Sequence, residues 1–375
     1  MTDKKIFGIY APGTKKVVAD LTQLNLNTIF TAPKNTYVRN AKNADLDVYV
    51  HFWTFKAPET TIKYGIKNIY GETLLWLDSG CPNNSEIKNS SLERIEKTGN
   101  NLDIDGIILD GIRFPSPANG LNAFLSCFCE YCHKAAKEQG FDLKEIRKEL
   151  KRIFKNVDKF FIGISAPINA LQFLVNHRAV LDWFIFKCKS IETHLKVVRQ
   201  KMHDVGMELN LGVDLFTPSL APLVGQDYQQ ITTHVDLIQP MIYHKGRGPA
   251  CINYELANMA LTLPSNREKQ EVLKALYGIF WRKDLNFPKK LDLLQKNGLP
   301  PEIISIEINR AIHLIQRTKI KLNPIVFIEE ATDQELIELI RIINQHKTHG
   351  LSLFAYSARL ADTKIDLGKL MKTVS

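Results

Sequence analysis

The sequence predicts an α/β protein, a (β/α)8 TIM barrel, from three observations. Eight short runs rich in β-branched and aromatic residues alternate with longer stretches of helical periodicity. Most of these runs are apolar nearly throughout, as expected of parallel strands covered on both faces. Polar side chains lie near the carboxyl ends of these runs, where TIM barrels carry their active sites. A doubly wound open sheet is the alternative fold.

The predicted strands are defined by the apolar runs, and the stretches between them read as helices. Two of these stretches, 181–205 and 333–346, place their apolar side chains at helical spacing. Strands are expected at residues 5–10, 27–32, 47–55, 105–114, 208–216, 235–243, 324–330 and 350–358.

Some stretches are longer than a minimal barrel requires. Residues 56–104 and about 120–180, after the third and fourth strands, predict insertions at the catalytic face or helices outside it. The segment FIGISAP (161–167) is a further candidate strand, which would break the count of eight. Residues 264–301 predict a peripheral insertion, and residues 1–375 are otherwise expected to form a single barrel domain.

Composition excludes several classes of protein. With 45% hydrophobic and 24% charged residues, the chain has an ordinary globular composition. The sequence contains no run of about 18 apolar residues, so no membrane span is predicted. The N-terminus lacks the apolar core of a secretory signal, so we expect a cytoplasmic protein. The net charge is +9, but both signs alternate in segments such as 142–156, which argues against a nucleic-acid partner.

Three of the predicted strands end in carboxylates, which indicates acid/base chemistry. Asp110 lies toward the end of the fourth run, Asp214 toward the end of the fifth, and Glu329 and Glu330 at the end of the seventh. Neighbouring carboxylates at one end of a barrel push their pKa values apart. We expect Asp110 to act as nucleophile or electrostatic partner, Glu329 as general acid/base and Asp214 as a third candidate. Side chains alternate along a strand, so only one of Glu329 and Glu330 faces the barrel axis. Glu330 is also a catalytic candidate, with the start of the next helix as its alternative role.

Five further strand-end residues are candidates for substrate binding. Arg113 is expected to orient Asp110 and keep it ionised, and the aromatic residues could stack on sugar faces. Simpler roles stay open: Asp110 could pair with Arg113 only to hold the loop, and Asp214 could cap the next turn. A histidine inside a strand is often a satisfied core residue. The candidates are Arg113, Trp53, Tyr243, His51 and Tyr356.

The cysteines indicate a metal site. Cys127, Cys129 and Cys132, in the sequence CFCEYC, leave one tetrahedral position open, and Cys81 is the best fourth ligand. A site with four cysteine ligands has no position left for substrate, so the predicted Zn²⁺ is structural and no cofactor is expected in catalysis. The alternative is that these cysteines are free buried thiols.

Two motifs resemble known enzymes. WLDSGCPNN together with DGIILDGIRFP resembles a family of TIM-barrel glycoside hydrolases, in which a strand of this form ends in the catalytic aspartate, here Asp110. Cys81, followed 46 residues later by CFCEYC, is similar to the four-cysteine zinc site of glycoside hydrolase family 42. That family has a glutamate after an asparagine where this chain has Asp110, so its specificity and residue roles do not carry over.

The resemblance implies a carbohydrate substrate and hydrolysis of a glycosidic bond by carboxylates. Two rivals remain. One is a barrel enzyme acting on a phosphorylated or amide substrate, with Lys245 and Arg247 as the anion grip. The other is a non-catalytic barrel that binds carbohydrate or protein.

Overall fold

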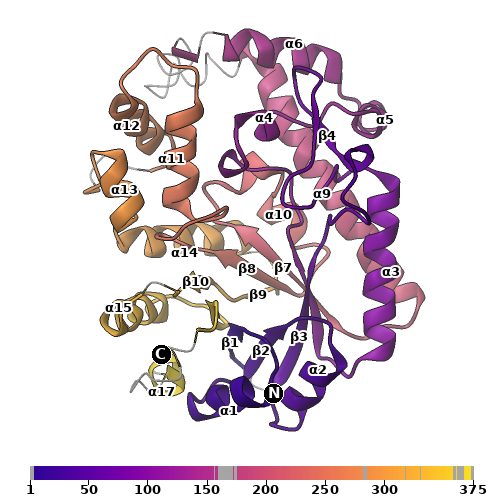
Figure 1. Ribbon diagram of the computed structural model, residues 1–375, viewed down its shortest axis with the longest axis vertical. Helices are drawn as coiled ribbons and strands as arrows, with labels where there is room; N and C mark the ends of the chain where they lie inside the picture. Colours follow the sequence, from indigo (N-terminus) through magenta and orange to yellow (C-terminus); the bar gives the residue numbers. More distant parts are fainter. Residues whose placement is uncertain are drawn as a thin grey trace.

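The computed structural model describes residues 4–155, 157–158, 172, 175–281, 285–316, 318–329, 331–357, 360 and 367–372. Parallel strands form a closed barrel inside a layer of helices (Figure 1). This confirms the predicted (β/α)8 TIM barrel. The barrel strands are β1 (Ile6–Tyr10), β2 (Thr28–Thr31), β3 (Asp47–Trp53), β6 (Gly106–Asp110), β7 (Asn210–Phe216), β8 (Leu237–Met241), β9 (Lys321–Leu322), β10 (Ile325–Phe327) and β11 (Gly350–Phe354).

The barrel closes through two connections. β1 pairs with both β2 and β11, and β10 bridges β8 to β11. β9 and β10 together occupy the seventh strand position and are separated by Asn323 and Pro324. Proline has no N–H to donate to a ladder, although the Pro324 carbonyl still accepts from the Ser352 N–H at 2.9 Å.

The helices begin at sequence signals that satisfy their first N–H groups. Thr14 and Asn84 accept hydrogen bonds from the first turns of α1 and α3, and Thr332 forms a capping box with Glu335 at α15. The helices are α1 (Lys15–Gln23), α2 (Asn35–Lys42), α3 (Ser85–Asn101), α4 (Leu121–Phe124), α5 (Glu130–Glu138), α6 (Leu143–Phe154), α9 (Arg178–Asp204), α10 (Tyr228–Ile231), α11 (Ile252–Thr262), α12 (Lys269–Phe280), α13 (Leu291–Asn297), α14 (Glu302–Ile315), α15 (Asp333–Asn344) and α17 (Leu367–Lys372).

Both predicted insertions are present. Between β3 and α3 lie the short helix η1 (Ile62–Tyr64) and a hairpin of β4 (Ile66–Lys67) and β5 (Thr73–Leu74). Between β6 and α9 lie η2 (Pro117–Asn119), α4, α5 and α6. The candidate strand 161–167 falls outside the described residues.

Within residues 264–301, α12 and α13 pack against α11. Two expectations stay predictions. One is that this segment is a peripheral insertion, and the other is that the chain forms a single domain. None of the described helices is both long and apolar enough to cross a membrane.

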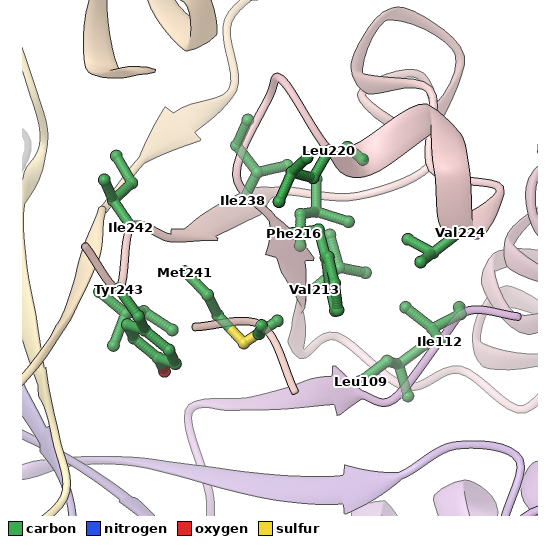
Figure 2. Packing of buried hydrophobic residues seen from close by; sticks show 14 of the residues in the cluster. Leu109, Ile112, Val213, Phe216, Leu220, Val224, Ile238, Met241, Ile242 and Tyr243 are labelled. Atoms are coloured by element: carbon green, nitrogen blue, oxygen red, sulfur yellow. The ribbon is translucent and has the colours of Figure 1, made fainter. Parts of the chain in front are cut away.

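Apolar packing fixes the ends of β6 and β7, where the predicted site residues lie. Figure 2 shows Val213 and Phe216 of β7 packed near Leu220 and Val224, with Ile112 after β6 close by. All five are at most 1% exposed. Burying side chains of this size stabilises by about 1.5–3 kcal/mol each, so the two strand ends are held rigidly.

Candidate active site

Strand register decides which side chains meet at the carboxyl end of the barrel. Trp53 of β3 is in register with Asp110 of β6, and Asp214 of β7 is in register with Gln239 of β8. The pairing of β6 with β7 brings Asp110 and Asp214 to the same level on neighbouring strands. Two of the predicted carboxylates, Asp110 and the third candidate Asp214, are therefore neighbours, whereas the pair expected from the sequence was Asp110 with Glu329.

Asp110 lies at the end of β6 with few partners. Its Oδ1 accepts from the Gly111 N–H at 2.6 Å, while its carbonyl accepts from the Thr54 N–H at 2.7 Å. Gly111 has φ +62°, and an added Cβ would lie 2.8 Å from the Trp53 ring, so only glycine fits. Burial raises the pKa of Asp110 to about 6, outweighing the Gly111 hydrogen bond and the charge of Arg113. Asp110 therefore titrates near neutral pH.

Asp214 is almost fully buried, at 3% exposed. Its Oδ1 lies 2.7 Å from the Tyr10 hydroxyl, which is also 3.2 Å from Oε1 of Gln239. Burial raises the pKa of Asp214 well above its ordinary value, and the neighbouring charge of Asp110 raises it further. Of the two carboxyl groups, Asp214 is therefore the harder to ionise.

Aromatic rings surround this pair. Tyr10 stacks on Phe30 at 4.6 Å, and Tyr243 lies 5.8 Å from Phe354 and 5.7 Å from Phe327. The charges of both aspartates reach the Tyr243 hydroxyl, whose pKa is raised first by burial and then by those charges. The predicted residue Tyr243 thus lies within reach of the charges of both carboxylates, in a largely buried cluster of aromatic rings.

Trp53 is also close to the pair. Its ring lies against Gly111 and its indole N–H donates to the Ser79 hydroxyl. The Arg94 guanidinium donates to the Trp53 carbonyl at 3.2 Å and holds this end of β3 in place. His51, on the same face of β3, lies 5.6 Å from Tyr10, and burial lowers its pKa to about 4. His51 is therefore a neutral ring and not a cation at neutral pH.

Arg113 differs from our expectation in its contacts. Among the described residues, no ion pair joins it to Asp110. Its guanidinium lies between the rings of Trp76 and Phe216, 4.6 and 4.8 Å from their centres, and donates to the Phe114 carbonyl at 3.0 Å. Its charge lowers the pKa of Asp110 less than burial raises it, so Arg113 does not keep Asp110 fully ionised. Two aromatic faces contact this cation, and the charge of Glu255 acts on it more strongly than that of Asp110.

The remaining candidates have no contact with the pair among the described residues. Glu329 is exposed in the turn after β10 and is not among the groups whose charges act on Asp110 or Asp214. Glu330 lies outside the described residues. The Tyr356 hydroxyl donates to Asp20 of α1 at 2.6 Å and so faces an outer helix. The catalytic and binding roles of these residues stay predictions without geometric support.

Lys245, which would bind an anionic substrate in the rival enzyme, is already paired with a carboxylate. Lys245 Nζ lies 3.2 Å from Glu335 Oε1, and the two form an ion pair with α15. A hollow of about 630 Å³ lies between α12 and residues 285–289, away from the strand ends. The candidate site is therefore assigned by the chemistry of its side chains and not by the size of a cavity.

The four predicted metal ligands come together. The sulfur atoms of Cys81, Cys127, Cys129 and Cys132 all lie within 4.8 Å of one another, and all four residues are at most 9% exposed. Cys81 Sγ is 3.4 Å from the sulfurs of both Cys129 and Cys132. This spacing suits four sulfurs around one tetrahedral ion with bonds of about 2.3 Å.

Hydrogen-bond donors surround the sulfur atoms, as they do around bound thiolates. The Lys67 N–H points at Cys127 Sγ at 3.3 Å, and the Asn83 N–H points at Cys81 Sγ at 3.3 Å. The Asn83 amide also reaches Cys132 Sγ at 3.4 Å. The cluster connects the insertion after β3 to the insertion after β6, the two segments that frame Trp53 and Asp110.

Sequence reasoning missed two residues of the site, Tyr10 and Gln239. Each had a weak signal: Tyr10 ends the first apolar run, and Gln239 is a polar residue inside the apolar strand LIQPM. A polar residue in the middle of a buried strand needs a partner, and that requirement alone pointed to the barrel interior.

Comparison with known proteins supports the fold. No family model matches the chain, and no curated protein matches it in sequence. The structure is similar to the PgaB (BpsB) glycoside hydrolase domain from Bordetella bronchiseptica, with a TM-score of 0.58, 9% identity and 99% of both chains covered. It is also similar to the β-galactosidase from the psychrophilic Marinomonas ef1, with a TM-score of 0.57 and 10% identity over 98% of this chain. The match spans 59% of that β-galactosidase. At these identities the likeness shows the fold alone.

Proposed function

We propose that this protein hydrolyses a glycosidic bond of a carbohydrate substrate. The observation that carries the proposal is the pair Asp110 and Asp214, on neighbouring strands at the carboxyl end of the barrel. Glycoside hydrolysis needs one carboxyl group that is protonated and one that is ionised. Burial raises the pKa of Asp214 well above its ordinary value and that of Asp110 to about 6, which supports Asp214 as the protonated partner.

The surroundings of the pair support a sugar substrate. Tyr243 and Trp53 flank the carboxylates with aromatic faces, and Phe327 and Phe354 extend that wall. The similar solved structures include two proteins named as a glycoside hydrolase domain and a β-galactosidase. In our proposal Asp214 is the general acid and Asp110 is the nucleophile or base. Glu329, which the sequence favoured as acid/base, becomes the alternative to Asp214.

The test is turnover of oligosaccharides and synthetic glycosides, with products identified by mass spectrometry. Wild-type protein is expected to release a sugar, and Asp110→Asn and Asp214→Asn are expected to lose that activity. Glu329→Gln is the matched comparison, because Glu329 is exposed and its charge is not among those that act on Asp110 or Asp214. A large loss in Glu329→Gln with full activity in Asp214→Asn would return the acid/base role to Glu329. Saccharide binding without any cleavage would favour the non-catalytic barrel.

We also propose that the cysteine cluster binds a structural Zn²⁺ through Cys81, Cys127, Cys129 and Cys132. Four buried sulfurs with N–H donors match the closed tetrahedral sites of structural zinc. When bound, the metal would cross-link the two insertions and would take no part in the reaction.

Metal content tests the zinc proposal. We expect about one zinc per chain in wild-type protein and none in Cys129→Ser, together with a lower melting temperature. Cys188→Ser is the matched control, because Cys188 is a buried cysteine of α9 outside the cluster, and it should keep its zinc. Zinc-free wild-type protein with unchanged thermal stability would show that the thiols are simply buried.

A further inference from the structure

The orientation of a buried amide network constrains the proton between Asp214 and Tyr10. The network consists of Gln239, Asn323 and Ser352, all of which are fully buried at 0% exposure. It runs across the barrel interior from the backbone of β1 to the Tyr10 hydroxyl. Each group in it has a defined number of donors and acceptors, so the proton positions can be worked out.

The starting point is a backbone carbonyl, which can only accept. Asn323 contacts the Ile6 carbonyl at 2.9 Å, so the Asn323 atom facing it is the donor Nδ2. The other amide atom, Oδ1, must then face Gln239 and Ser352 as an acceptor. The Gln239 atom 3.0 Å from that oxygen is therefore the donor Nε2, which also lies 3.1 Å from Ser352 Oγ.

This orientation leaves the Gln239 oxygen pointing at Tyr10. Oε1 lies 3.2 Å from the Tyr10 hydroxyl, and no other described residue donates to it. The same hydroxyl lies 2.7 Å from Asp214 Oδ1. A phenol has a single proton, so it can satisfy Gln239 or Asp214 but not both. A buried carbonyl oxygen that is left without a donor carries a desolvation cost.

We propose that Tyr10 is a positioning residue whose hydroxyl proton switches between Gln239 and Asp214. While Asp214 is protonated, its Oδ1–H donates to Tyr10, and Tyr10 donates to Gln239, so every buried group has a partner. When Asp214 gives up its proton, the Tyr10 hydroxyl turns to donate to the carboxylate and Gln239 loses its donor. Tyr10 keeps its own proton throughout. Gln239 therefore biases Asp214 toward the protonated form.

The ring of Tyr10 is held still, so that only the hydroxyl has to rotate. It stacks on Phe30 with ring centres 4.6 Å apart and planes 13° apart, and it lies 5.5 Å from Phe354. The ionisable groups that face Asp214 are Asp110 on β6, Tyr10 on β1 and Tyr243, which follows β8. No cation is among the groups whose charges act on Asp214. This inference deepens the proposed function, because a general acid must enter the reaction with its proton.

The test follows the protonation of Asp214 directly, without substrate. Protein labelled with ¹³C at the aspartate carboxyl is titrated by NMR, and Asp214→Asn identifies the signal. Gln239→Met removes the competing acceptor, so the Asp214 titration should shift to lower pH by about one unit. Tyr10→Phe removes a partner from both protonation states, so it should shift the titration little. In Tyr10→Phe, adding Gln239→Met should have no further effect. Ser352→Ala, which alters the network beyond Gln239, is the matched control.

A simple donor role for Tyr10 predicts the opposite pattern. Tyr10→Phe would then raise the pH of the Asp214 titration, and Gln239→Met would leave it unchanged. Either result overturns the switch. If Gln239→Met does not fold, the Tyr10→Phe titration still separates the two. A protein without glycosidase activity but with the expected shifts would keep the switch and refute only the proposed function.

Discussion

Two pairs of carboxylates differ in how completely their oxygens are hydrogen-bonded. Glu307 of α14 is fully buried and accepts from Thr217, Ser219, Trp281 and Arg310 at 2.6–2.9 Å. Glu255 of α11, also fully buried, accepts from the Ala118 and Ala250 N–H groups. Each brings an outer helix to the loop that follows β7 or β6.

Asp110 ends β6 and Asp214 lies two residues before the end of β7, yet each has few partners. Within the described part of the chain, one donor reaches Asp110 and one hydroxyl reaches Asp214. A carboxylate that is saturated with donors stabilises a loop, whereas one with free lone pairs is available to a substrate. The glutamates hold the loops, and the free lone pairs of the aspartates are consistent with the catalytic roles proposed for them.

The largest expected effect is on catalytic turnover, which should depend on the aspartate pair. Asp110→Asn should lower turnover of the true substrate by about 10²–10⁴-fold, because its carboxylate acts on the reacting atoms. The folded state should remain intact, which circular dichroism and a melting curve would check. Turnover within tenfold of wild type would show that Asp110 is not part of the reaction.

The second effect concerns stability. Glu307→Gln should lower the free energy of unfolding by about 3 kcal/mol, since it removes a buried charge paired with Arg310 and leaves donors unmatched. Urea unfolding monitored by tryptophan fluorescence measures this directly. Asp214→Asn, with its single hydroxyl partner, is the comparison and should cost far less. Equal losses in both variants would remove the distinction between the pairs.

A smaller effect on the free energy of unfolding has the opposite sign, because replacing Asp110 should stabilise the protein. Folding raises the pKa of Asp110 to about 6, above its unfolded value, so the fold penalises the ionised form. The penalty is absent below about pH 4 and complete above about pH 6. Asp110→Asn should therefore stabilise the protein by about 1–2 kcal/mol at pH 7, a figure reduced for partial exposure, and by nearly nothing at pH 4. Urea unfolding at both pH values tests this, and a loss of stability at pH 7 would contradict it.

The smallest effect tests the rival anion grip. Lys245 pairs with Glu335 near the surface, so Lys245→Met should change stability by about 0–1 kcal/mol and leave glycoside turnover unchanged. Isothermal titration with inorganic phosphate is the matching measurement. Phosphate binding that disappears in Lys245→Met would revive an enzyme acting on phosphorylated substrates.

The sequence alone determined the fold and the cluster of four cysteines. All eight strand positions follow from apolar runs, because a strand buried on both faces is apolar along nearly its whole length. The cysteine set follows from spacing, since three of its members lie within six residues. Asp110 was also identifiable, because a carboxylate directly after an apolar strand has few structural explanations.

Only the tertiary structure decided which carboxylate accompanies Asp110. The seventh strand ends at Phe327 and leaves Glu329 exposed in the following turn, a boundary that local sequence does not reveal. Arg113 turns toward two aromatic rings that come from distant segments. Tyr10 and Gln239 are 229 positions apart and meet across the barrel interior only because the sheet closes on itself. Closure of the barrel is a global property, so no local pattern encodes the contacts it creates.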